Sequence, residues 1–266
     1  MIREHRLDTS RGRFRCLDSG AGWPVLLIHA FPLTADMWRP QLERCARGWR
    51  YLAPDLRGFG RSPVGTVSPS MDDYAADLEA IMDLLEIDSA VIGGLSMGGY
   101  ITFALHRRAP ERFSGLLLAD TKSEADTPQG REGRREMSSL LRSEGIGAVA
   151  DRMLPKLLSR ASQADAELSS TVRTLIETNS VEGVDLAIHA LRDRQDSTPD
   201  LPHISLPTLV VVGEEDALTP PSDSRRMQAA LVRSQLVVLH GAGHLSNLEA
   251  PAPFSAALSD FLTSSL

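Results

Sequence analysis

The sequence has few cysteines, no excess of basic charge and no long apolar run, and each shortage excludes a class of protein. Cys16 and Cys45 are too few for a disulfide framework and are not spaced as metal ligands. The formal charge of -7 argues against a nucleic-acid partner, because phosphate binding needs a clustered basic face. No apolar run approaches the ~20 residues of a membrane span. The polar start lacks the apolar core of a signal peptide, so we expect a cytoplasmic protein without membrane contact.

The sequence does contain short apolar runs that alternate with longer amphipathic segments. The runs are continuous, which is typical of strands covered on both faces. They span residues 25–29, 51–54, 90–93, 115–119, 208–212 and 236–239. Helical patterns occupy residues 71–85, after a capping signal at Ser70 and Asp73, and residues 98–109, 225–231 and 254–262. This alternation predicts an α/β fold with a mostly parallel sheet flanked by helices, and residues 13–17 as an antiparallel edge.

One long stretch contains no convincing strand. Between Lys122 and about Asp200 the sequence favours helices at residues 130–144, 146–158, 164–179 and 181–194. Strands resume only after two prolines, at Thr208. We therefore predict a core domain made of residues 1–121 and 201–266, with residues 122–200 as a helical cap inserted between two strands.

The segment Gly-Leu-Ser-Met-Gly at residues 94–98 has the pattern G-x-S-x-G. An apolar strand leads into it and a helix leads out, which is the strand–turn–helix context that a nucleophile elbow requires. Gly94 and Gly98 leave room where the chain doubles back. The alternative is a glycine-rich turn with an incidental serine. The context favours Ser96 as the nucleophile.

A serine hydroxyl needs a base, and the base needs an orienting acid. His244 lies in a glycine-flanked loop between the last predicted strand and the final helix. Asp216 follows the strand at 208–212, which gives the chain order serine, acid, histidine known for this fold. Asp120 also ends a predicted strand and is the competing acid. We predict a Ser96–His244–Asp216 triad.

The negative charge that develops on a carbonyl oxygen needs two backbone N–H donors. Met97 follows the candidate nucleophile and supplies one. Phe31, in the loop after an early strand, is expected to supply the other, because Pro32 cannot donate and stiffens the loop. His29 is expected to fix this loop by hydrogen bonding rather than to react.

These motifs together resemble the α/β-hydrolase superfamily over nearly the whole chain. Residues 29–32, His-Ala-Phe-Pro, look like its His-Gly-x-Pro motif, with Ala30 in place of glycine. Residues 55–62 look like its D-x-R-G-x-G-x-S loop, and residues 213–220 and 241–244 like its acid and histidine segments. The chain is most similar to capped esterases and lactonases related to 3-oxoadipate enol-lactonase. That resemblance implies an eight-stranded sheet, a cap of four helices after the sixth strand, and no cofactor or metal.

The predicted activity is hydrolysis of small carboxylic esters or lactones through an acyl-enzyme. The alternatives are perhydrolysis, as in the cofactor-free haloperoxidases the chain also resembles, carbon–carbon bond or cyanohydrin cleavage on the same triad, and a ligand-binding receptor on this fold. Substrate-binding residues are expected within residues 122–200, whose apolar side chains favour short neutral acyl groups. A carboxylate-bearing lactone becomes the better substrate if one or two arginines of this segment point inward. These arginines are Arg131, Arg134, Arg135, Arg152, Arg160 and Arg173.

Overall fold

The protein is built on one eight-stranded sheet. The structure, a computed structural model, describes residues 1–65 and 68–265, so residues 66, 67 and 266 of the predicted core domain lie outside the described residues. The strand order is β1-β2-β4-β3-β5-β6-β7-β8. The strands are β1 (Arg3–Thr9), β2 (Gly12–Asp18), β3 (Trp23–Ile28), β4 (Trp49–Pro54), β5 (Ala90–Leu95), β6 (Phe113–Ala119), β7 (Thr208–Gly213) and β8 (Ser234–Leu239). All pairs from β4 to β8 are parallel, which confirms the predicted mostly parallel α/β sheet.

The antiparallel end of the sheet differs from the sequence-based prediction in one strand. Residues 13–17 do lie in an antiparallel strand, β2, but β2 is not the edge, because β1 pairs with its outer side. Leu7 is the single buried residue of β1. A strand with so little apolar burial has no apolar run, so hydrophobicity alone does not reveal it.

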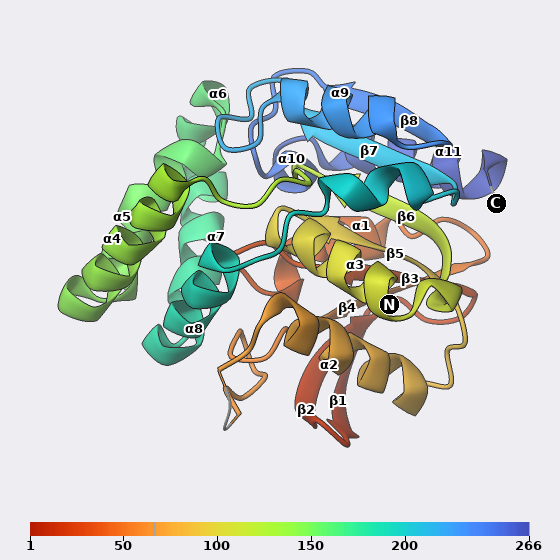
Figure 1. The fold of residues 1–266 in the computed structure, drawn as a ribbon, viewed down its shortest axis with the longest axis horizontal. Helices are drawn as coiled ribbons and strands as arrows, with labels where there is room; N and C mark the ends of the chain where they lie inside the picture. The colour runs from red at the N-terminus through yellow and green to blue at the C-terminus, as the bar shows by residue number, and fades with distance from the viewer. Residues whose placement is uncertain (66–67, 266) are drawn as a thin grey trace.

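Helices cover both faces of the sheet (Figure 1). In front lie α2 (Met71–Leu84), α3 (Met97–Arg108) and α9 (Pro221–Ala230), and behind lie α1 (Arg39–Glu43) and α11 (Pro251–Ser264). The predicted capping box of α2 is present, with Ser70 accepting from the Asp73 N–H at 3.1 Å and Asp73 accepting from the Ser70 N–H at 3.0 Å. Short elements η1 (Ala35–Trp38), η2 (Pro110–Arg112) and α10 (Ser246–Glu249) complete the core. No described helix is long and apolar enough to cross a membrane.

Helices fill the connection between β6 and β7. They are α4 (Pro128–Glu144), α5 (Ile146–Leu157), α6 (Arg160–Gln163), α7 (Ala166–Glu177), α8 (Val181–Arg192) and the 3-10 turn η3 (Thr198–His203). Figure 1 shows α4–α8, called the insertion helices below, as a group at one side of the sheet. The helix expected at residues 164–179 is α7, which begins at Ala166 because Asp165 caps it by accepting from the Glu167 and Leu168 N–H groups. The short helix α6 precedes it and was not expected.

The insertion helices are attached to the core by a close backbone approach and one amide side chain. Gly183 of α8 lies against Gly58 in the loop after β4, where a Cβ on Gly183 would overlap the Gly58 carbonyl oxygen. Asn179, between α7 and α8, donates to the Pro32 carbonyl at 2.7 Å and accepts from the Gly60 N–H at 2.7 Å. The loops after β3 and β4 therefore hold the insertion helices in register.

We predict that Gly183→Ala destabilises the protein. The added methyl group must separate two backbones, and overpacking of this kind costs about 1–3 kcal/mol, or roughly 2–12 °C in Tm for a chain of this size. Gly147→Ala in α5 is the matched control, because its Cβ meets only the Glu177 carboxylate at 3.8 Å. Its Tm should stay constant or rise, since alanine favours helix. Equal melting temperatures for the two variants would contradict the close approach.

Candidate active site

The turn between β5 and α3 places Ser96 at the carboxyl edge of the sheet. Ser96 has φ 56° and ψ -111°, a region that residues other than glycine rarely adopt. Gly94 and Gly98 meet the Ile28 carbonyl oxygen so closely that neither site has room for a Cβ. The small neighbours predicted from the G-x-S-x-G pattern are therefore required by the packing of α3 against β3.

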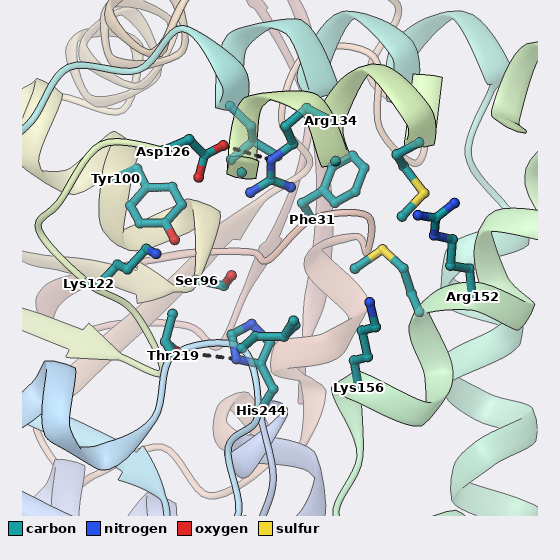
Figure 2. A pocket seen from close by; sticks show the side chains of 16 residues that line it. Phe31, Ser96, Tyr100, Lys122, Asp126, Arg134, Arg152, Lys156, Thr219 and His244 are labelled. Carbon is teal, nitrogen blue, oxygen red and sulfur yellow. Dashed lines mark hydrogen bonds and ion pairs between the residues drawn. The ribbon is translucent and has the colours of Figure 1, made fainter. Parts of the chain in front are cut away.

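The histidine loop and the acid loop meet beneath this turn. His244 Nδ1 lies 2.9 Å and 2.8 Å from the two carboxylate oxygens of Asp216. Both side chains are buried. Ser96 and His244 line one cavity of about 310 Å³, a volume at the lower end of small-molecule sites. Figure 2 shows the Ser96 hydroxyl facing this cavity, with His244 on one side of it. The structure thus brings together the three residues of the predicted triad.

The structure also distinguishes the two competing acids. Asp120 accepts from the Gly213 N–H at 2.8 Å and from the Ser246 hydroxyl, and His244 is bonded to Asp216 instead. Asp120 thereby ties the end of β6 to the loops that carry the acid and the histidine. Its position at a strand end, which made it a competitor in the sequence, corresponds to this bridging contact.

The two buried carboxyls have opposite pKa shifts. Burial alone raises the pKa of Asp216, but the charge of His244, its hydrogen bond and the Thr219 donors lower the pKa below its usual value. Burial and the charge of Asp216 raise the pKa of Asp120 well above its usual range. Two adjacent carboxylates cannot both ionise at little cost. Ionisation is therefore favoured at Asp216 over Asp120.

The predicted oxyanion donors flank the nucleophile. Met97 is the first residue of α3, so its N–H has no partner within the helix. Phe31 lines the cavity. His29 is buried, and its Nε2 accepts from the Leu56 N–H at 3.0 Å, which confirms that it fixes the loop. Burial lowers the pKa of His29, in keeping with a neutral ring.

Basic side chains dominate the charged part of the cavity wall. The wall contains four cations and a single acid, and these are Lys122, Arg134, Arg152, Lys156 and Asp126. Two of the six arginines considered from the sequence are thus among the lining residues.

Sequence reasoning did not single out Tyr100, Lys122 or Lys156. A signal for the first two was present. Tyr100 lies one helical turn after Ser96, and Lys122 follows β6, the neighbour of β5 in the sheet. Carboxyl ends of neighbouring parallel strands share one edge, where sites form. No group of three or more potential metal-ligating side chains occurs within residues 1–65 and 68–265.

The chain is similar to a known family and to several known proteins. The alpha/beta hydrolase fold family matches residues 24–251. A thermophilic esterase from Thermogutta terrifontis, solved with malate bound, is 37% identical with a TM-score of 0.93, over 99% of each chain. The 3-oxoadipate enol-lactonase 2 of Acinetobacter baylyi is 29% identical over 88% of this chain and 87% of its own. A putative non-heme chloroperoxidase of Synechocystis is 30% identical over 86% and 87%.

The two acids make a testable contrast. Asp216→Asn should lower turnover severely, by an amount on the order of 10⁴ as in serine proteases that lose the orienting carboxylate. Asp120→Asn should change kcat by less than about tenfold, since Asp120 does not contact His244 and the amide keeps an oxygen for the Gly213 N–H. Both variants are compared by kcat on p-nitrophenyl butyrate. A larger loss of kcat in Asp120→Asn than in Asp216→Asn would show that Asp120, not Asp216, orients His244.

Proposed function

The chain belongs to the α/β-hydrolase fold family, and we propose that it is a serine hydrolase cleaving small carboxylic esters or lactones through an acyl-enzyme. One observation carries the proposal: the cavity that exposes the Ser96 hydroxyl also exposes His244, whose ring is bonded to a buried carboxylate. Esterases and enol-lactonases among the relatives support the same reaction class.

In the proposed reaction, Ser96 attacks the carbonyl carbon while His244 Nε2 accepts the hydroxyl proton. Asp216 holds the other ring nitrogen, so the accepting nitrogen faces the cavity, and its charge stabilises the imidazolium that forms. The N–H groups of Phe31 and Met97 then stabilise the tetrahedral oxyanion.

Collapse of that intermediate expels the alcohol, which takes its proton from His244. Water then enters, gives a proton to His244 and attacks the acyl-enzyme, and the acid leaves from Ser96. Every proton in the cycle passes through His244. Protonation of the free imidazole therefore removes the base that Ser96 needs.

Perhydrolysis is the second candidate, and the similarity to a putative non-heme chloroperoxidase favours it. Hydrogen peroxide in place of water would attack the same acyl-enzyme and release a peracid. The two activities differ only in the second nucleophile. Peracid formed from an ester and peroxide, measured beside the rate of hydrolysis, determines their ratio.

We predict that a fluorophosphonate probe labels one residue, Ser96. Ser96→Ala should lose both the label and ester turnover. Ser224→Ala is the matched control, because it removes another buried serine hydroxyl, on α9, that has no hydrogen-bond partner among the described residues. That variant should keep full labelling and activity. Labelling at another residue, with an active Ser96→Ala protein, would refute the assignment; peptide mass spectrometry locates the label.

A further inference from the structure

Lysine has an unusual distribution in this chain. Only two of the 28 basic residues are lysines, Lys122 and Lys156, and the rest are arginines. Both lysines line the cavity that contains Ser96. Figure 2 shows them on opposite sides of the serine, with Lys156 nearer to His244 and Lys122 beside Tyr100.

The cavity arginines have acidic partners, whereas the lysines do not. Arg134 pairs with Asp126 at 3.0 Å, and Arg152 pairs with Glu136 at 2.9 Å. Neither lysine has a carboxylate within 4.0 Å in the described part of the chain. Lys156 is exposed, so water solvates its charge, and Lys122 is half-buried. Lys122 is therefore the cation of the cavity that gains most from a negatively charged ligand.

The backbone next to Lys122 is tied to the nucleophile. The Thr121 hydroxyl donates to the Ser96 carbonyl at 2.8 Å, so Lys122 follows a residue anchored on the elbow. Its side chain keeps the rotational freedom of a lysine, with three donors at its end. The Lys122 ammonium can thus contact a ligand group near Ser96 without movement of the insertion helices.

Tyr100 provides a second donor beside Lys122 (Figure 2). The Arg194 guanidinium stacks on its ring at 4.2 Å from the centroid, and Arg194 pairs with Asp126 at 2.7 Å. The ring is therefore fixed on its outer face. Burial raises the pKa of Tyr100, so its hydroxyl stays protonated near neutral pH and can donate.

The arrangement around Ser96 indicates which part of a substrate reaches these donors. In the proposed reaction His244 protonates the departing alcohol, so the alcohol portion lies on the His244 side of the serine. Figure 2 places Lys122 and Tyr100 on the other side. The acid portion of the substrate therefore extends toward Lys122.

We propose that Lys122, with the Tyr100 hydroxyl, forms a subsite for a free carboxylate on the acid portion of the substrate. The preferred substrates are then monoesters of dicarboxylic acids, or lactones that carry a second carboxylate. This inference rests on the proposed hydrolysis at Ser96. It assigns specificity to one residue at the end of β6 rather than to the paired arginines of the insertion helices.

The kinetic test compares charged and neutral esters of the same shape. The p-nitrophenyl monoesters of glutaric, adipic and pimelic acid are each paired with an ester whose carboxylate is replaced by an isopropyl group. The best charged ester should exceed its neutral partner about tenfold or more in kcat/KM, after subtraction of uncatalysed hydrolysis. Lys122→Met should reduce that ratio at least about tenfold, ~1.4 kcal/mol of transition-state binding. Tyr100→Phe should reduce it less.

Lys156→Met is the matched control, since it removes the same charge at an exposed position of the cavity wall. In Lys156→Met, the kcat/KM ratio of charged to neutral ester should fall no more than about threefold. This fall should vanish at about 0.5 M salt, where exposed charges are screened. A wild-type protein with no preference for the charged esters would overturn the proposal. So would equal effects of Lys122→Met and Lys156→Met, or a loss in Lys122→Met that is the same for both kinds of ester.

A binding measurement separates this subsite from the proposed reaction. Glutarate should bind the Ser96→Ala protein in calorimetry, and the added Lys122→Met change should weaken binding at least about tenfold. Binding that is unaffected, with Ser96 of the wild type labelled by fluorophosphonate, would overturn the subsite and leave the hydrolase proposal standing. Binding that depends on Lys122, with no label on Ser96, would overturn the hydrolase proposal and support the subsite.

Discussion

The buried contact between Asp216 and His244 constrains most of the structure around the site. An ionised carboxylate inside a protein must be paired and hydrogen-bonded, or it takes up a proton. Asp216 accepts from the Leu218 N–H at 2.8 Å, the Thr219 N–H at 3.0 Å, the Thr219 hydroxyl at 2.7 Å and His244. The loop after β7 must wrap around the carboxylate to supply these donors. The charge of Asp216 raises the pKa of Asp120, which serves as a bridge between loops.

The histidine at the other end of this contact is held by the insertion helices as well as by the core. Glu249 accepts from the Gly243 N–H at 2.9 Å and the Leu245 N–H at 3.2 Å, on either side of His244. Its second oxygen accepts from the Ser159 N–H at 2.8 Å, between α5 and α6. Since Asn179 ties the same helices to the loops after β3 and β4, the walls of the cavity and the reacting groups are parts of one connected structure.

The fold and the positions of the candidate triad residues could be predicted from sequence because each depends on a local pattern. Parallel strands buried on both faces leave continuous apolar runs, and residues that follow such runs meet at one edge. Ser96, Asp216 and Phe31 follow three of these runs. β1 was missed because an exposed edge strand has no such run. Lys122 and Tyr100 were missed because their significance depends on which charges are paired, and pairing is a property of tertiary structure.

The difference between arginine and lysine explains why the charge of the cavity has to be considered residue by residue. A guanidinium is a planar fork that suits a carboxylate, and Arg134 and Arg194 both pair with Asp126, so these three side chains keep one net positive charge. Although burial opposes it, these two cations lower the pKa of Asp126. Both guanidiniums are held in place by Asp126, and Arg194 also stacks on the Tyr100 ring. A chain of net charge -7 repels anions at long range. A local cation without a protein partner is what allows an anionic substrate to bind. On the subsite proposed above, the insertion helices shape the cavity, and the preference for a charged substrate arises at the end of β6, where the Thr121 hydroxyl donates to the Ser96 carbonyl.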